Sequence, residues 1–354
     1  MADTTINKKK LNKILPITLI ILLLAATAID YFYNYRTHTQ KMTKQSFAMG
    51  APIFCSIYTD DEAYSDKISK EIFDQIKYAD TVCLSSTGVQ SDIYKLNQNK
   101  SAIISPATLE VMKKGIEYNK DCELFDITIG NLSHLWGIDT DRAKVPTQEE
   151  INTALSTIDI NSIKIFEITN KVVIGKNQKI DLGAIGKGVA CDEAKKIFVN
   201  QNTKSAIVSV GGSIVLHGSF PNSKDGLWTV GIKRPELGKN DYVISVKVPA
   251  CFVSTSGDYE KVLSKNGKNY HHILDPFTGY PVDNDLSSVT VFANSGVDAD
   301  FLSTACFSLG YNEKSLNLLK KYNAQAIFID HNKKVTCTDE IKDKIKIEDH
   351  TYKF

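Results

Sequence analysis

The sequence predicts an α+β fold, because strand-like and helical runs alternate without a regular βαβ rhythm. Residues 52–58 form an apolar strand-like run, and residues 61–79 carry isoleucines at the spacing of an amphipathic helix. Of the 354 residues, 42% are apolar and 23% are charged, which is enough to build a core of ordinary size. We expect one folded domain over residues 46–354.

Capping signals predict two more helices. Ser105 before Pro106 is typical of a helix start and indicates a helix over 105–120. Thr147, with Glu150 three residues later, predicts a capping box at the start of another helix. The remaining predicted elements are strands at 163–169, 171–174, 206–210, 228–233, 243–248 and 288–292, a helix at 313–322 and a strand at 326–329.

Charge and cysteine usage exclude some classes of protein. The net charge is +1 and no RNA- or DNA-binding motif is present, so we expect no nucleic-acid partner. None of the seven cysteines forms a CxxC or CxxxC pair, so a structural zinc site has no support. We interpret the cysteines as small buried hydrophobes, and a disulfide pairing stays open.

The N-terminus predicts a membrane anchor. Residues 1–13 form a basic tail, and residues 14–33 form an apolar run with tyrosines at its end, which we expect to be a transmembrane signal anchor. The lysines before the run predict a single-pass protein of the cell membrane with an extracytoplasmic catalytic domain. The alternative is a cleaved signal peptide, because residues 26–28 have the small-x-small form of a cleavage site. The polar residues 34–45 are predicted to be a linker.

Two segments are rich in glycine and are candidates for a binding site. Residues 181–188 read DLGAIGKG, and three glycines with one lysine resemble a phosphate-cradling loop; a tight turn is the alternative. Residues 209–213 read SVGGS and predict a strand that ends in two glycines.

Two further segments combine hydroxyl and carboxyl groups. Residues 253–260 read VSTSGDYE, for which a capped helix start is the alternative to a binding site. Asp300 and Thr304 lie four residues apart, so a helix there would place both oxygens on one face, where they suit a hard cation beside phosphate oxygens. The alternative is an N-cap aspartate followed by a threonine that bonds back to a carbonyl.

In this order, these segments resemble the ApbE family, the FAD:protein FMN transferases. Residues 48–50 are similar to the family's opening Met-Gly, and residues 91–97 to its Ser-x-x-x-x-Leu-Asn. Residues 125–136 resemble its Asp-x-Thr-x-Gly-Pro-Leu…Trp segment. The sequence departs from the family's usual residues at four positions: Asn131 for Pro, Ser213 for Asp, and Gly186 and Val189 for Ala and Tyr.

The resemblance implies an ApbE-like (T-fold-related) single catalytic domain and names its site residues. The implied Mg²⁺ ligands are Asp300, Thr304 and the carbonyl of Ala184. The implied catalytic residues are His272, Lys187 and Asp300. The implied FAD-binding residues are Met49, Asp181, Lys187, Gly211, Gly212, Ser256, Asp258, Tyr259 and His272.

The implied function is Mg²⁺-dependent transfer of FMN from FAD to a Thr or Ser hydroxyl of an exported acceptor protein, which releases AMP. One alternative is an FAD pyrophosphatase that yields FMN and AMP. Others are a non-catalytic flavin-binding surface protein and an extracellular solute-binding protein.

Overall fold

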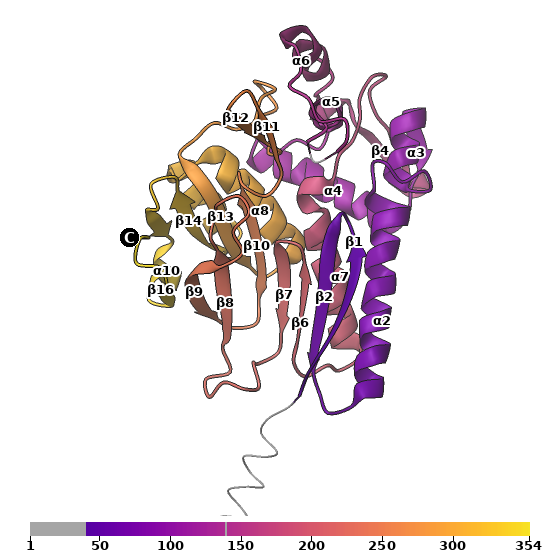
Figure 1. The fold of residues 1–354 in the computed structure, drawn as a ribbon. Coiled ribbons are helices and arrows are strands. Elements are labelled where there is room, and N and C mark those ends of the chain that lie inside the picture. Colours follow the sequence, from indigo (N-terminus) through magenta and orange to yellow (C-terminus); the bar gives the residue numbers. More distant parts are fainter. Residues whose placement is uncertain (1–39, 139) are drawn as a thin grey trace, which may run out of the picture.

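The computed structural model describes residues 40–138 and 140–354 (Figure 1). The predicted basic tail, the predicted anchor and the first part of the predicted linker lie outside these residues. Within them, no helix is long and apolar enough to cross a membrane. The predicted α+β class is confirmed, since helices and antiparallel strands build one layered body.

An eight-stranded sheet forms the centre of the molecule, and every neighbouring pair in it is antiparallel. Its strands follow each other in space in the order β1-β2-β6-β7-β10-β13-β14-β15. Their bounds are β1 Lys41–Ala48, β2 Ala51–Tyr58, β6 Ala206–Val210, β7 Ser213–His217, β10 Phe252–Gly257, β13 Leu286–Ala293, β14 Gln325–Asp330 and β15 Val335–Cys337.

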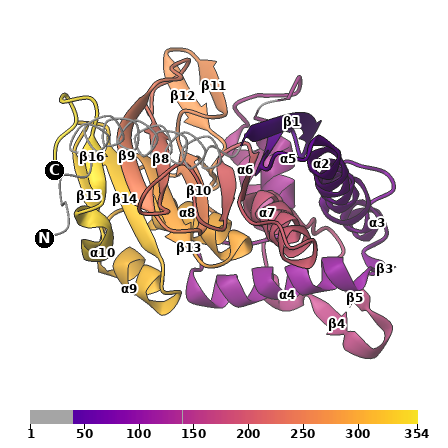
Figure 2. The same ribbon diagram turned by 90° about the horizontal axis from the view of Figure 1, so that it is seen from below.

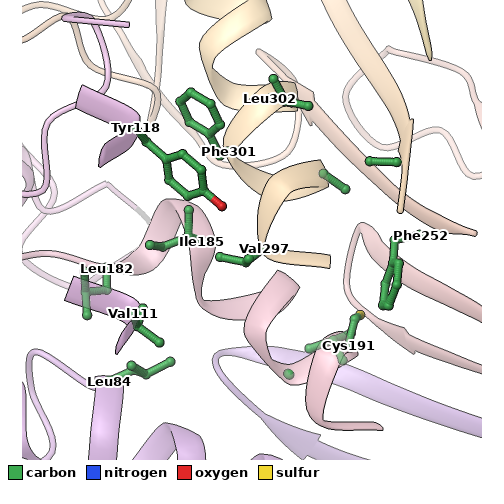
Figure 3. Close-up of a cluster of buried hydrophobic side chains, with 14 of the residues drawn as sticks. Leu84, Val111, Tyr118, Leu182, Ile185, Cys191, Phe252, Val297, Phe301 and Leu302 are labelled. Atoms are coloured by element: carbon green, nitrogen blue, oxygen red, sulfur yellow. The ribbon is translucent and has the colours of Figure 1, made fainter. Parts of the chain in front are cut away.

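Helices cover one face of this sheet and enclose the larger core (Figure 2). They include α2 (Glu62–Tyr78), α4 (Pro106–Asp121), α7 (Gly183–Asn200), α8 (Gly296–Leu309) and α9 (Glu313–Lys321). The cap predicted for α4 is present, since Ser105 accepts the backbone N–H of Thr108; Asp61 caps α2 in the same way, by accepting the N–H of Tyr64. Figure 3 shows how α4 and α8 meet: the ring of Tyr118 stacks on that of Phe301, with centroids 4.0 Å apart.

A small sheet covers part of the opposite face. It contains β8 (Trp228–Lys233), β9 (Tyr242–Val248) and β16 (Ile345–Ile347), which pack on the large sheet around a second core. The predicted strand at 228–233 is therefore confirmed with its bounds, and that at 243–248 begins one residue earlier.

Shorter elements gather around the upper end of the large sheet in Figure 1 and along its α2 side. The capping box predicted at Thr147 is present at the start of α6, where Thr147 and Glu150 bond each other's backbone. The bounds are η1 Ala79–Leu84, α3 Asp92–Asn99, β3 Ser101–Ile103, α5 Gly130–Trp136, α6 Gln148–Leu155, η2 Ile160–Ser162, β4 Lys164–Phe166, η3 Glu167–Thr169, β5 Lys171–Val173, β11 Val262–Lys265 and β12 Lys268–His271. The short helix α10 (Asp339–Lys342) lies on the opposite side of the molecule, beside β14 and β16.

Three local predictions are wrong. Residues 41–45 were expected in the linker, but they belong to β1, whose polar side chains are mostly exposed at the sheet edge. Residues 183–188 were expected in a loop or tight turn, but they open α7. The strand expected at 163–169 covers only residues 164–166, because residues 167–169 turn into a 3-10 helix.

The hydroxyl-rich segment begins in strand β10, which excludes the alternative of a capped helix start. Ser254 is buried there, and Thr255 and Ser256 are half-buried.

Glycine opens α7 because the helix crosses α8 at very short range. A Cβ atom on Gly188 would lie 2.2 Å from the carbonyl oxygen of Gly296, and a Cβ atom on Gly296 would lie 2.3 Å from the carbonyl oxygen of Gly188. Asp192 of α7 also accepts the N–H groups of Gly296 and Val297 at 2.8 and 2.9 Å. These contacts fix the start of α8, and with it the height of Asp300, against α7.

We predict that Gly188→Ala lowers the free energy of unfolding by about 1–3 kcal/mol, because the added methyl group forces the two helices apart. Gly186→Ala is the matched control, since a Cβ atom there would lie 3.9 Å from Leu84, an ordinary contact. Alanine favours helix over glycine, so the control is neutral or more stable by up to about 1 kcal/mol. Urea unfolding measures both. Equal destabilisation by the two substitutions would contradict the close crossing.

Candidate functional site

The predicted site residues gather at one end of the large sheet, the upper end in Figure 1. The turn from β1 to β2, the turn from β6 to β7, the first turns of α7 and the end of β10 meet there. A Cβ atom on Gly211 would lie 3.2 Å from Cβ of Ala51 and 3.7 Å from Cδ of Lys187. Gly211 has φ +56°, which a glycine adopts without strain. The glycine pair therefore lets three elements approach one another.

Asp300 is the most heavily bonded side chain of this region. Its residue is only 3% exposed. Oδ2 accepts the N–H of Gly188 at 2.6 Å, and Oδ1 accepts the hydroxyls of Ser213 and Ser254 at 2.5 Å each. These bonds join α8 to α7, β7 and β10. A carboxylate offers about four acceptor positions, so about one remains for another ligand.

Ala184 lies in the exposed first turn of α7, four residues before Gly188. The N–H of Gly188 donates to Asp300 Oδ2 at 2.6 Å, so the Asp300 carboxylate lies against the second turn of α7. The Ala184 carbonyl is therefore one helical turn from the contact between Gly188 and Asp300.

Thr304 follows Asp300 by one turn of α8, so the predicted helical spacing is confirmed. Its Oγ1 lies 3.2 Å from Oγ of Ser256, which lies 2.9 Å from Oγ of Ser303. A line of hydroxyl groups therefore continues from Asp300 along the facing side of β10. Every oxygen in it is a ligand type that Mg²⁺ accepts.

Met49 adopts a backbone conformation that is rare for its residue type. With φ +55° at Met49 and +67° at Gly50, the two residues close the β1–β2 hairpin, where Asn-Gly is the favoured pair. Asp80, in the π-helix η1, accepts the N–H of Met49 at 2.8 Å. A carboxylate from another element thus holds Met49 in a strained backbone conformation, which indicates a functional role for this residue.

Lys187 and Glu260 lie on either side of the glycine turn. A Cβ atom on Gly212 would lie 3.3 Å from Oε1 of Glu260, and Gly211 approaches the Lys187 stem. Glu260 is exposed, but protein atoms crowd its carboxyl group and raise its pKa, while Lys187, Lys233 and Lys261 act in the opposite direction. The site thus contains a lysine and a carboxylate of opposite charge at its mouth.

His272 is neutral in this environment. Burial, together with the positive charges of Lys261 and Lys187, lowers the pKa of His272 to about 3. The backbone of Lys261 hydrogen-bonds the ring. Buried Nδ1 has no hydrogen-bond partner in the part of the chain that the structure describes. An unprotonated Nδ1 beside Lys187 can accept a proton from a bound group.

Three other predicted FAD-binding residues have structural partners. Asp181 Oδ1 accepts the N–H of Gly183 at 2.8 Å and so caps the start of α7. Asp258 Oδ2 lies 2.8 Å from Nε2 of His331. Tyr259 is 8% exposed and packs against Gly257, where a Cβ atom would lie 2.5 Å from its ring. These contacts shape the end of β10 that borders Ser256 and Glu260.

Asp80 and Ser254 were not among the predicted site residues, and neither was Glu260. Ser254 and Glu260 fall inside the hydroxyl-rich segment at 253–260, although neither was chosen within it. Asp80 lies in η1, just after the amphipathic helix α2, and no sequence signal distinguishes it. By contrast, residues 125–130, which resemble part of a family motif, have a structural role. Asp126 Oδ1 accepts the N–H and the hydroxyl of Thr128 at 2.7 and 2.6 Å.

Fold and site together define an ApbE-type domain, and the family model "ApbE family" matches residues 49–328. The chain belongs to the ApbE family, so the resemblance found in the sequence is confirmed. A relative from Klebsiella pneumoniae, named FAD:protein FMN transferase, is 30% identical over 292 residues, which cover 81% of this chain and 88% of that protein. One of the same name from Treponema pallidum is 34% identical over 238 residues, covering 64% and 66%.

Solved structures agree with this assignment. The ApbE protein of Thermotoga maritima matches with a TM-score of 0.79 at 27% identity, covering 86% of this chain and 99% of that one. The flavin transferase ApbE from Vibrio cholerae matches with a TM-score of 0.72 at 25% identity, with the same coverage.

We predict that His272 makes the protein less stable in acid. Because its pKa is lower in the folded than in the unfolded state, the unfolded chain binds the extra proton between pH about 6.5 and about 3, and the free energy of unfolding falls as pH falls through that range. The slope from this group is at most about 1.4 kcal/mol per pH unit. Urea unfolding of wild type and His272→Gln from pH 7 to 4 measures it. Parallel pH dependences would contradict the lowered pKa.

Proposed function

We propose that this chain is a Mg²⁺-dependent FAD:protein FMN transferase that acts on a Thr or Ser hydroxyl of an exported protein. Family membership and the names of the relatives support the transferase activity. The observation that carries the metal requirement is the hydrogen bond from the N–H of Gly188 to Asp300, which holds the carboxylate against α7 one helical turn after Ala184. The substrate is FAD and the partner is a flavin-acceptor protein.

The residues present fit a magnesium ion. Asp300, Thr304 and Ala184 offer a carboxylate, a hydroxyl and a backbone carbonyl, all oxygens, and Mg²⁺ needs few protein ligands when phosphates and waters complete its shell. When bound there, Mg²⁺ neutralises charge on the pyrophosphate oxygens of FAD.

The transfer breaks one P–O bond and forms another. The acceptor hydroxyl oxygen attacks the phosphorus of the FMN half, the bridging oxygen leaves with AMP, and the hydroxyl proton must move to a base. His272 Nδ1 is neutral, buried and open to a partner. Bound phosphates raise the proton affinity of a nearby imidazole, so the base gains strength when FAD is in place.

Lys187 and the glycine turn position the nucleotide. The lysine stem lies against Gly211, and its ammonium can pair with the pyrophosphate. Met49 projects from its strained turn at the same end of the sheet and supplies an apolar contact for the flavin ring. Glu260 limits how far the Lys187 ammonium can swing, because it holds the opposite charge on the other side of the turn.

We predict that Asp300→Asn lowers Mg²⁺-dependent flavinylation by at least about 10²-fold while FAD binding persists. The amide is isosteric: its oxygen can face Gly188 and its NH₂ group the two serines, so the fold is retained. Asp298→Asn is the matched control, because Asp298 bonds Tyr118 on the far side of the same helix. The flavinylation rate of this variant is expected to stay within about threefold of the wild-type rate.

The assay mixes FAD, Mg²⁺ and candidate exported proteins, and mass spectrometry detects added FMN. Wild-type rates in Asp300→Asn would contradict the metal assignment. Release of FMN and AMP with no modified protein would identify a pyrophosphatase instead.

We also propose that residues 14–33 anchor the chain in the cell membrane with the catalytic domain outside the cytoplasm. The lysines at positions 8, 9, 10 and 13 and the apolar run after them support this orientation. The chain is expected to stay with the membrane after alkaline carbonate washing and to be digested when protease is added to intact spheroplasts. A chain protected from protease, or one released by carbonate, would contradict this topology.

A further inference from the structure

The two edge strands of the large sheet differ in their length and in how they are covered. β15, at one edge, is only three residues long, and the C-terminal segment covers it: Val335 donates to the carbonyl of Lys353, and Lys353 to that of Lys333. β1, at the other edge, is eight residues long, and its register with β2 runs without a bulge. Proteins normally shorten, bulge or cover such an edge, because its free backbone groups pair with other chains.

The register shows which backbone groups of β1 face outward. Residues beside a two-residue turn form a hydrogen-bonded pair, and bonded and non-bonded pairs then alternate. Ala48 pairs with Ala51 across the turn, so Met42, Lys44 and Ser46 bond to β2. The bond from Thr59 N–H to the Gln40 carbonyl fits the same alternation. The N–H and C=O groups of Thr43, Gln45 and Phe47 therefore point away from the sheet.

A groove runs along this edge. A hollow of about 690 Å³ lies between β1 and α2. Its lining is partly charged and includes two aromatic rings: Thr43, Lys44, Gln45 and Phe54 from the sheet, and Asp66, Ser69, Lys70, Phe73 and Asp74 from α2. An ion pair of 2.6 Å between Lys44 and Asp66 holds the strand to the helix. An edge strand beside a helix, with a hollow between them, is an arrangement that accepts an extended peptide as an added strand.

The groove is continuous with the site. β1 passes from Gln45 to Met49 in four residues, about 13 Å of extended chain, and ends in the turn that we place against the flavin. Two aromatic rings remain exposed on the sheet face beside this path, since Phe47 is 70% and Phe54 43% accessible. A segment that pairs with β1 would thus pass these two rings on its way to the mouth of the site, and Figure 1 shows that β1 ends there, at its turn into β2.

We propose that an extended segment of the flavin-acceptor protein adds to β1 as a ninth strand and so delivers its target hydroxyl to the site. The segment pairs through the backbone of Thr43, Gln45 and Phe47. Its side chains are apolar where they meet Phe54 on one face of the sheet and Phe73 of α2 on the other. This inference rests on the proposed function, because only a transferase needs a protein acceptor. It explains how one site can reach a hydroxyl in a folded partner.

Gln45→Pro tests the pairing. Proline removes the outward N–H of Gln45 and puts a ring on the edge, yet breaks no bond to β2, so the fold is expected to persist. Gln45→Ala is the matched control, since it keeps the N–H. With the acceptor found by its added FMN mass, kcat/KM for the acceptor falls roughly tenfold in Gln45→Pro and stays within twofold in Gln45→Ala, while both variants bind FAD like wild type. Equal rates in the two variants would overturn the proposal.

Residue-resolved hydrogen–deuterium exchange of the full-length chain gives a second test that needs no variant. Without acceptor, the amides of Met42, Lys44 and Ser46 exchange slowly and those of Thr43, Gln45 and Phe47 exchange rapidly. Saturating acceptor is expected to slow the second set at least tenfold. Protection of another surface instead would overturn the proposal.

Other occupants of the edge give different results in the same experiment. Slow exchange of Thr43, Gln45 and Phe47 without acceptor and at high dilution would mean that another segment of this chain fills the groove. Slow exchange that appears only at high protein concentration would mean that a second copy fills it. Either outcome overturns the proposal. Failure of the wild-type chain to add FMN to any protein would instead reject the proposed function.

Discussion

The site depends on the carboxylate of Asp300, which is buried and accepts hydrogen bonds from three different elements. A buried charge without partners would be costly, and here a backbone N–H and two serine hydroxyls stabilise it. The same bonds fix the position of α8 against α7 and the sheet. One side chain therefore has both a structural role and the chemical role that we propose for it.

α7 and α8 must lie close together for Asp300 to reach the N–H of Gly188. Gly188 and Gly296 allow the backbones to touch, and Asp192 caps the start of α8 from the side of α7. The glycine-rich stretch that resembles a phosphate-cradling loop is therefore helical, and its glycines serve helix packing as well as the site. Ser213, which stands where the family usually has aspartate, donates to Asp300 and so contributes to the same cluster without adding a second buried negative charge.

The sequence alone predicted much of the fold and the site, for identifiable reasons. Helix caps at Ser105 and Thr147 depend on neighbouring residues and were predicted correctly. The spacing of Asp300 and Thr304 depends only on helical periodicity and was confirmed. β1 was missed because an exposed edge strand buries little and shows no apolar alternation. Asp80 was missed because its contact with Met49 joins residues 31 apart in sequence, which no local pattern can reveal.

The central claim is that α7 and α8 hold a divalent cation between them. The most direct measurement is anomalous diffraction from crystals soaked in MnCl₂ together with FAD. The account predicts one peak at about 2.0–2.3 Å from oxygens of Asp300, Thr304 and Ala184. A peak coordinated by other residues, or full FAD occupancy with no peak at these oxygens, would contradict it.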